Sequence, residues 1–389
     1  MWISITLSKN NNMKKLPLLL LLLLFSFCST IKQLSNQKIE ENKGCSDMQL
    51  EGKNALLDVE IDHVNTKFLL DTGAGLSVLI DSTIVLDFNN KKFGSLGSAK
   101  GADRKKIKNR FFTVELNTDL FKSESKVLSF VNLPKSKCIK TKKEYTGILG
   151  MDVFFNEDFV MQLDFTGSKV CNITSPQLQQ YLTDGQYQLL KSKCKSNQIF
   201  VYLNIEGKEY PFKLDTGYTG NIIMPYDAEL NFKNDKKLEL EGSLFQTISS
   251  HTSGSETLYE KMPITFGTYN LEAKLNVSTS IKAQNIGIDF IKAFDWLIDY
   301  NNNKVYIKRN QNPIESILNR KISYYVKVNQ EKLQIVIKEK SQTQYQLGDQ
   351  IISVDGQKVT AENQCELQDL LNKTDDWNSL QLEVIPVQK

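Results

Sequence analysis

An internal duplication constrains this chain more than any other feature of its sequence. The segment FLLDTGAGLSVLI at Phe68–Ile80 is repeated in similar form as FKLDTGYTGNIIMP at Phe212–Pro225. Each copy has an Asp-Thr-Gly triplet directly after an apolar run, and the two acidic residues, Asp71 and Asp215, are 144 residues apart. Self-similarity of this kind is the signature of repeated structural units. We therefore expect the same local structure to occur twice.

A second pair of segments supports the duplication. The sequence GILGMDVF at Gly147–Phe154 resembles NIGIDFI at Asn285–Ile291, and each leads on to an apolar run that ends in an acidic residue, Asp164 or Asp299. The offset is 137 residues between the glycines that end the two closing motifs and 135 residues between the two aspartates. Offsets this similar at separate anchors indicate two duplicated domains. Asp152 and Asp289 recur as well, and all four of these aspartates are interpreted as structural residues.

The segments around these anchors have the pattern of β-strands. Apolar runs at Leu56–Ile61 and Phe200–Ile205 precede the two triplets, and short alternating segments such as Phe111–Leu116 lie between the anchors. Alternation of this length, broken by Gly- and Asn-containing turns, is typical of strands, whereas long helical periodicity is scarce. Both halves are therefore expected to be mostly β.

Composition narrows the chemistry that is available. The 389 residues include 48 Lys and Arg against 45 Asp and Glu, a net charge of +3, so no nucleic-acid partner is expected. The two histidines, His63 and His251, are far apart, which gives little support to a His-based metal centre or to Ser-His and Cys-His catalysis. We expect no metal and no cofactor. Carboxylates, hydroxyls or lysines must then carry any reaction.

Two Asp-Thr-Gly loops have a chemical meaning that one loop lacks. A single triplet is most often an ordinary turn, but a two-fold arrangement would bring two carboxylates into one cleft. Two carboxyls about 3 Å apart cannot both ionise, so the pair holds one proton near working pH. The ionised member can then take a proton from water while the protonated member hydrogen-bonds to a carbonyl under attack. These are the requirements of peptide-bond hydrolysis.

The triplets at Asp71-Thr72-Gly73-Ala74 and Asp215-Thr216-Gly217 resemble the active-site loops of aspartic peptidases. The later Ile148-Leu149-Gly150 resembles the motif that closes each lobe in that family, and the closest resemblance is to retropepsin-like domains of bacterial envelope proteins. The resemblance implies two β-barrel lobes in a pseudo-two-fold arrangement, at residues 50–185 and 190–309, acting on a peptide or protein substrate.

The resemblance also assigns roles to individual residues. Asp71 and Asp215 would be the catalytic pair, Thr72 and Thr216 would lock the two loops by reciprocal hydrogen bonds, and Gly73 and Gly217 would be turn residues beside the pair. Flaps over the cleft are implied at Gly94–Lys106 and at Gly242–Gly254, which includes His251; the alternative for each is a surface hairpin. Ala74 stands where a Ser would bond a catalytic carboxylate, which implies a less acidic working range.

The second lobe departs from the family pattern. Tyr218 follows the second triplet where the family usually has a small residue, so the ring could cover the pair or tilt the loop. The second closing motif, Asn285-Ile286-Gly287, keeps its glycine but begins with a polar residue. These departures leave an alternative function open: a catalytically inactive envelope protein that binds peptides or partners in the same cleft or through its C-terminal unit.

Residues 318–389 form a separate unit that resembles a PDZ domain. The resemblance rests on LGDQIISVDG at Leu347–Gly356, in which two turns flank a buried strand. Such domains bind an extended peptide as an added edge strand, with its terminal carboxylate held by backbone N–H groups. The glycine-flanked loop that would hold this carboxylate is missing near Ser323–Val328. The alternative is a small β module that only packs on the lobes.

The N-terminal residues 1–28 read as an export signal, and Met13 is the expected true start. Lys14 and Lys15 precede an apolar run at Leu16–Phe25, which is too short for a permanent membrane span. Cys28 resembles the acylated cysteine of bacterial lipoproteins, although the preceding residue is not small; simple cleavage is the alternative. We expect a periplasmic or lipid-anchored outer-membrane protein, or else a secreted one, with a linker at residues 29–49.

The remaining cysteines are widely spaced and include no C-x-x-C pair. They are Cys45, Cys138, Cys171, Cys194 and Cys365. In an oxidising compartment one or two disulfides are expected, with one thiol left over. The sequence specifies neither their pairing nor the oligomeric state.

Overall fold

A computed structural model of the chain describes residues 38–387, except residues 95–97, 101–104, 109, 133–137, 139–143, 155–157, 231, 247–250 and 319–322. Strands make up 50% of the structure and helices 11%, which confirms the mostly β class. The predicted export signal, with Cys28, lies outside the described residues. Within the part that is described, no helix is both long and apolar enough to span a membrane.

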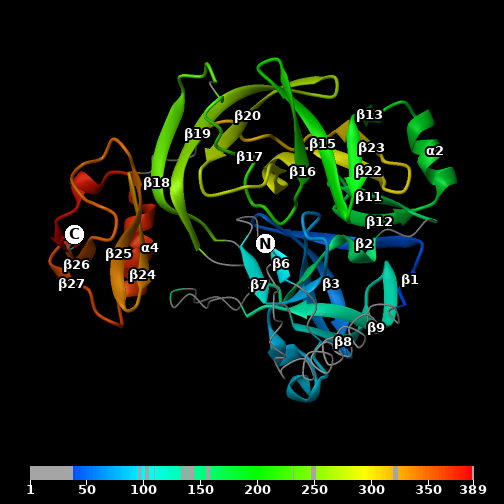
Figure 1. Cartoon of the computed structure of the whole chain (residues 1–389), viewed down its shortest axis with the longest axis horizontal. Helices are drawn as coiled ribbons and strands as arrows, with labels where there is room; N and C mark the ends of the chain where they lie inside the picture. The colour runs from blue at the N-terminus through cyan, green and yellow to red at the C-terminus, as the bar shows by residue number, and fades with distance from the viewer. Residues whose placement is uncertain are drawn as a thin grey trace, which may run out of the picture.

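The first half of the chain forms a closed six-stranded barrel, coloured blue to cyan in Figure 1. In ring order its strands are β3 (Asn54–Ile61), β4 (Val64–Leu70), β10 (Gly147–Leu149), β5 (Val78–Leu79), β9 (Phe121–Phe130) and β8 (Arg110–Asn117). The ring closes because β8 pairs with β3 as well as with β9. Within the ring, β10 runs parallel to β4 and antiparallel to β5.

The second half repeats this topology strand for strand. In the same ring order its strands are β15 (Gln198–Ile205), β16 (Lys208–Leu214), β21 (Asn285–Ile286), β17 (Ile222–Pro225), β20 (Tyr269–Ser278) and β19 (His251–Phe266). Here β21 is parallel to β16 and antiparallel to β17, and β15 closes the ring by pairing with β19. The duplication in the sequence is therefore a duplication of the barrel.

One sheet joins the two barrels. In order its strands are β2 (Gly44–Glu51), β12 (Lys169–Ile173), β11 (Val160–Asp164), β22 (Phe294–Asp299), β23 (Lys304–Arg309) and β13 (Gln188–Leu190). At its centre β11 from the first half pairs antiparallel with β22 from the second, with Gln162 opposite Leu297. The two hairpins β11–β12 and β22–β23 thus meet symmetrically, and buried apolar side chains form one cluster across both barrels.

The segment that was expected to be a linker contains β-strands. Residues 29–49 were expected to be a linker, but β2 begins at Gly44 and pairs with β12. Cys45 and Cys171 face each other in this pairing and form a disulfide. β2 lies between β3 and β12, and β12 is more than 100 residues further along the chain, so the local sequence does not reveal this pairing.

Alternation of side chains builds the core of each barrel. In β15, Ile199, Val201, Leu203 and Ile205 are 0–1% exposed, while the residues between them are partly exposed. Successive side chains of a strand point to opposite faces, so a period of two places one set inside. Burying each such aliphatic side chain contributes about 1.5–3 kcal/mol.

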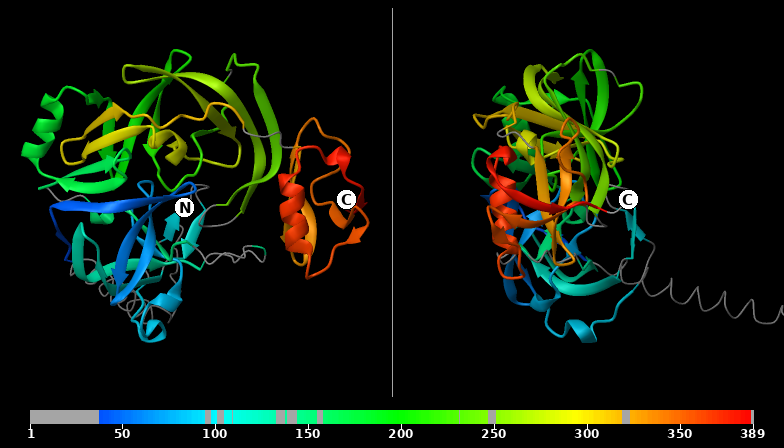
Figure 2. Two further views of the ribbon diagram at one scale, coloured as in Figure 1. Left: turned by 180° about the vertical axis from the view of Figure 1, so that it is seen from behind. Right: turned by 90° about the vertical axis from the view of Figure 1, so that its left-hand side faces the viewer.

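The C-terminal unit has its own core and docks on the second barrel. It contains β24 (Tyr324–Asn329), β25 (Lys332–Glu339), β26 (Gln350–Val354), β27 (Gln357–Lys358), α4 (Gln364–Lys373) and β28 (Leu382–Ile385). β25 pairs with β18 (Lys237–Gln246), so the unit lies at the side of the second barrel in Figures 1 and 2. A disulfide between Cys138 and Cys365 links α4 to the first half of the chain.

The remaining elements are short. They are β1 (Glu40–Glu41), β6 (Ser98–Lys100), β7 (Lys106–Lys108), β14 (Ser192–Lys195), α2 (Ser175–Thr183), α3 (Ile288–Ile291) and 3-10 turns at Ser82–Ile84, Phe88–Asn90, Met151–Val153 and Trp377–Ser379. The expected flap spans fall on the hairpins β6–β7 and β18–β19. The tips of these hairpins, residues 101–104 and 247–250, lie outside the described residues.

Candidate active site

Each Asp-Thr-Gly triplet begins directly after the second strand of its barrel, β4 in the first and β16 in the second. Asp71 follows β4, and its backbone N–H donates to the Leu149 carbonyl of β10 over 3.0 Å. Asp215 follows β16 and donates in the same way to the Ile286 carbonyl of β21, also over 3.0 Å. The closing motifs identified in the sequence therefore lie directly beside the triplets and hold the two aspartates at equivalent places.

Thr72 and Thr216 join the loops of the two barrels. The Thr72 N–H donates to the Thr216 hydroxyl over 3.0 Å, and the Thr216 N–H donates to the Thr72 hydroxyl over 3.1 Å. The hydroxyls in turn donate across the interface to the carbonyls of Leu214, over 3.0 Å, and Leu70, over 2.6 Å. Both threonines are fully buried. The reciprocal hydrogen bonds implied by the family resemblance are thus present.

The two carboxyl groups meet between these loops. The Asp215 carboxyl is among the groups that raise the pKa of Asp71, so the two carboxyls lie within reach of each other. Each carboxyl also packs against the glycine of the opposite loop: a Cβ atom at Gly73 would lie 2.3 Å from Cγ of Asp215, and one at Gly217 would lie 2.5 Å from Cγ of Asp71. Only glycine allows this backbone approach. The structure therefore brings the predicted aspartates, threonines and glycines into one site.

The Asp71 carboxyl sits in surroundings that favour its protonated form. Desolvation by the surrounding protein, followed by the charge of Asp215, raises the pKa of Asp71 to about 7. Lys213 acts against this shift, as do the backbone N–H groups of Gly73 and Ala74, which donate to Oδ1 over 2.8 and 3.0 Å. The net result is that Asp71 keeps its proton up to near-neutral pH.

The Asp215 carboxyl has different neighbours. It is 8% exposed, and its Oδ2 accepts a hydrogen bond from Nδ2 of Asn285 over 2.5 Å. Nζ of Lys213 lies 3.6 Å from the same oxygen and donates to the Gly73 carbonyl of the other barrel over 3.0 Å. Lys213 was not among the residues predicted from the sequence, although a signal for it exists: the first triplet follows Phe-Leu-Leu and the second follows Phe-Lys-Leu.

Two glycines accommodate the bulky Tyr218 in the second barrel. A Cβ atom at Gly220 would lie 2.3 Å from the Tyr218 hydroxyl, and one at Gly287 would lie 2.6 Å from its ring. Burial, followed by the charge of Glu256 on β19 and then that of Asp215, raises the pKa of Tyr218 well above its usual value. Tyr218 thus packs within its own barrel beside the carboxyl pair and stays neutral.

The four other duplicated aspartates have structural partners, as expected. They are Asp152, Asp164, Asp289 and Asp299. Asp152 forms an ion pair with Lys126, and Asp289 forms one with Lys53 over 2.5 Å. The other two accept backbone N–H groups of the turns that follow them, over 2.7 and 3.2 Å.

In the C-terminal unit, side chains of α4 bond the backbone groups at one edge of strand β24. Among the described strands β24 pairs only with β25, and its other edge faces α4. There the Asn372 side chain bonds both the N–H and the carbonyl of Val326, over 2.8 and 2.9 Å, and Gln368 accepts the Val328 N–H over 2.7 Å. An added peptide strand would need these same backbone groups. In this arrangement α4 occupies the edge at which a PDZ-like unit would bind a peptide.

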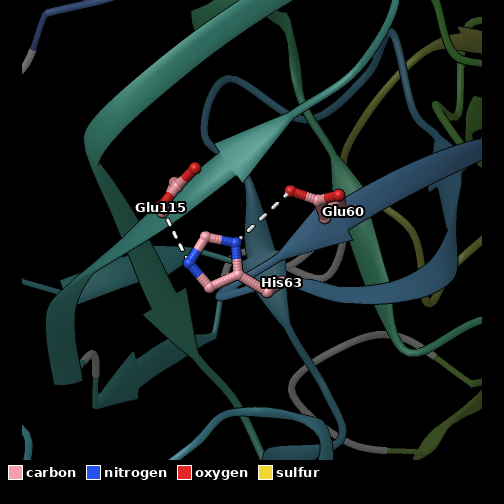
Figure 3. A group of neighbouring side chains, drawn as sticks. All are labelled: Glu60, His63 and Glu115. Atoms are coloured by element: carbon pink, nitrogen blue, oxygen red, sulfur yellow. Dashed lines mark ion pairs between the residues drawn. The ribbon is translucent and has the colours of Figure 1, made fainter.

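One further cluster of potential metal-ligating side chains occurs within the described ranges. Figure 3 shows the His63 ring between Glu60 and Glu115, with Nδ1 3.8 Å from Glu60 and Nε2 3.6 Å from Glu115. The His63 side chain is 74% exposed. One potential ligand atom from each residue lies within 4.8 Å of the other two, but each ring nitrogen faces a different carboxylate. We interpret the cluster as a solvated polar group of little energetic weight.

No known protein-family model matches the chain, and no curated protein matches it. The geometry of the paired Asp-Thr-Gly loops is therefore the main evidence on function.

Proposed function

We propose that this protein is an aspartic endopeptidase that hydrolyses peptide bonds in extended peptide or protein substrates. The observation that carries the proposal is the facing pair of carboxyls of Asp71 and Asp215, each packed against the glycine of the opposite loop, on loops that Thr72 and Thr216 join. Each carboxyl comes from one of two topologically equivalent barrels, which supports a retropepsin-like assignment with one aspartate from each lobe.

A carboxyl pair that shares one proton supplies an acid and a base together. The ionised carboxylate removes a proton from water, the water oxygen bonds to the peptide carbonyl carbon, and the protonated carboxyl gives its proton to the carbonyl oxygen. Collapse of the resulting diol breaks the C–N bond while a proton passes to the departing nitrogen. With the pKa of Asp71 raised to about 7, we expect activity to extend toward neutral pH.

We propose a packing role for the C-terminal unit, whose resemblance is to PDZ domains. Asn372 and Gln368 already bond the strand edge that a peptide would use, and β25 extends the sheet of the second barrel. Export to the bacterial cell envelope also stays a proposal. It is supported by the two disulfides, Cys45–Cys171 and Cys138–Cys365, because such bonds persist in oxidising compartments.

The proposal is tested by incubating the purified protein with a mixed peptide library and identifying the cleavage products by mass spectrometry. We expect cleavage that a pepstatin-type inhibitor blocks and that Asp71→Asn and Asp215→Asn each abolish. The matched control is Asp369→Asn, which changes an exposed helix residue paired with Lys373. This variant should cleave like the unmodified protein.

Two results would contradict the proposal. Cleavage that survives both dyad substitutions would come from another site or a contaminant. Binding of peptides without cleavage from pH 3 to pH 8 would instead identify the protein as a catalytically inactive binder.

A further inference from the structure

The second barrel has a polar pair at a place where the first barrel is apolar. Lys213 of β16 lies opposite Asn285 of β21 in the register, and the equivalent pair in the first barrel is Leu69 opposite Ile148. Both pairs sit one residue before the strand ends from which the aspartates emerge. The two halves of the dyad therefore differ in polarity although their backbones match.

The polar pair acts on only one of the two carboxyls by direct contact. Asn285 donates to Oδ2 of Asp215 over 2.5 Å, and the Lys213 ammonium lies 3.6 Å from the same atom. A donated hydrogen bond and a nearby positive charge both favour the ionised form of a carboxyl. Lys213 is held in place because it also donates to the Gly73 carbonyl across the barrel interface over 3.0 Å.

Around Asp71, the groups that favour the protonated carboxyl outweigh those that favour the ionised one. Among the described residues, the titratable groups that face it are Asp215, Lys213 and Tyr145. Its two backbone donors favour ionisation, but desolvation and the negative charge of Asp215 outweigh them. Around Asp215 the charged and titratable neighbours are Lys213, Asp71 and the neutral Tyr218.

We propose that Lys213 and Asn285 are positioning residues that fix the location of the shared proton, holding Asp215 as the ionised base and leaving Asp71 as the protonated acid. This inference rests on the proposed peptidase function. Asp215 then takes the proton from water as the water oxygen bonds to the substrate carbon. Asp71 delivers its own proton to the carbonyl oxygen, so that each proton has one donor and one acceptor.

The first test is the pH dependence of kcat/KM for Lys213→Met, Lys213→Gln and Lys213→Arg. Removing the positive charge makes both ionisations of the dyad harder, so Met and Gln should move both limbs of the profile upward by about one to three pH units. Met removes both the charge of Lys213 and its hydrogen bond to the Gly73 carbonyl, whereas Gln removes the charge but can still donate this hydrogen bond. Comparing the two variants therefore separates the effect of the charge from that of the hydrogen bond. Lys213→Arg should restore the original limbs. A loss of rate with unmoved limbs would reduce Lys213 to a structural role and overturn the inference.

The second test does not depend on activity. Urea midpoints at pH 6 are measured for Asp71→Asn and Asp215→Asn, each with Lys213 and with Lys213→Met, to give two double-mutant cycles. We expect stronger coupling of Lys213 to Asp215 than to Asp71, because the proposed assignment puts the negative charge on Asp215, whose Oδ2 lies 3.6 Å from the ammonium. Equal coupling, or stronger coupling to Asp71, would overturn the proton assignment.

The two tests separate the inference from the function on which it rests. A protein that cleaves peptides but shows no Lys213-dependent shift and no preferential coupling retains its function and loses the inference. A protein that cleaves nothing loses the proposed function, while the coupling cycles still decide where the proton lies.

Discussion

The Thr72 N–H donates to the Thr216 hydroxyl and the Thr216 N–H donates to the Thr72 hydroxyl, over 3.0 and 3.1 Å. These two residues are 144 positions apart in the chain, yet the hydroxyl of each accepts the backbone N–H of the other in the buried contact between the two loops. The carboxyls of Asp71 and Asp215 flank this contact. Their separation is therefore set by a rigid, buried network and not by two independent loops.

Removing one hydroxyl of this network should destabilise the whole molecule. Thr72→Val deprives the Thr216 N–H of its acceptor and the Leu214 carbonyl of its donor, both in a buried site. Each unsatisfied buried group costs about 1–3 kcal/mol, so we expect a loss of roughly 2–6 kcal/mol in the free energy of unfolding, measured with urea. Thr72→Ser keeps the hydroxyl and is the control. Equal losses in the two variants would show that the hydrogen bonds carry little weight.

Gly217→Ala should impair activity more than stability. Its Cβ atom would lie 2.5 Å from Cγ of Asp71 and would push that carboxyl out of line. A displacement of about 1 Å at a reacting group can cost on the order of 100-fold in rate, which we expect in kcat/KM. Gly75→Ala, in the first loop, is the matched control, because its nearest contact would be an ordinary 3.6 Å. Unchanged kcat/KM in Gly217→Ala would contradict the close approach of the loops.

The contribution of Asp71 to the stability of the folded protein should fall as the pH rises from about 4 to about 7. The pKa of Asp71 is raised to about 7 in the folded state, compared with about 3.9 for an unfolded aspartate. Between these values the folded state binds more protons than the unfolded state, so the Asp71 contribution is complete below about pH 4 and is lost through pH 7. Its slope is at most about 1.4 kcal/mol per pH unit.

Urea unfolding of the unmodified protein and Asp71→Asn across this pH range isolates that contribution. The difference between the two should change with pH, in favour of the variant at higher pH, because Asn does not titrate. Asp369→Asn should show no such trend. A pH-independent difference for Asp71→Asn would mean that the pKa of Asp71 is not raised.

Gly242→Ala should detach the C-terminal unit from the second barrel. Gly242 has φ +123° and pairs with Ile337, and a Cβ atom there would lie 2.1 Å from the Val336 carbonyl oxygen. The variant should lose hydrogen-exchange protection at the Lys340 amide, which donates to the Glu239 carbonyl over 2.9 Å. Ser243→Ala, one residue further on, is the control. Retained protection in Gly242→Ala would contradict the observed pairing.

Much of the site could be predicted because its signals are local and occur twice. The site is encoded by short contiguous motifs. These are the triplets that contain Asp71 and Asp215 and the closing motif that ends at Gly150. Their repetition at a similar offset indicated two duplicated domains, and the family resemblance implied that each is a β-barrel lobe. The mostly β class followed from alternation in segments such as Phe111–Leu116, which lies within β8.

Other features escaped prediction because they depend on partners distant in the sequence. Lys213 matters only because its strand end lies within reach of both Asp215 and the opposite loop. Residues near Cys45 read as a linker because one of the two partners of β2, the strand β12, lies more than 100 residues further along the chain. The Asn372 contact with β24 is equally invisible in the sequence of α4.

The amino-acid sequence by itself determined the duplication, the mostly β class and the six residues of the paired loops. Each of these features can be recognised from short segments of consecutive residues. Only the tertiary structure decided the disulfide pairing, the docking of β25 on β18 and the unequal surroundings of the two carboxyls. The physical reason is that strand pairing and electrostatics depend on distances in space, and neither periodicity nor motif spacing specifies which remote segments become neighbours.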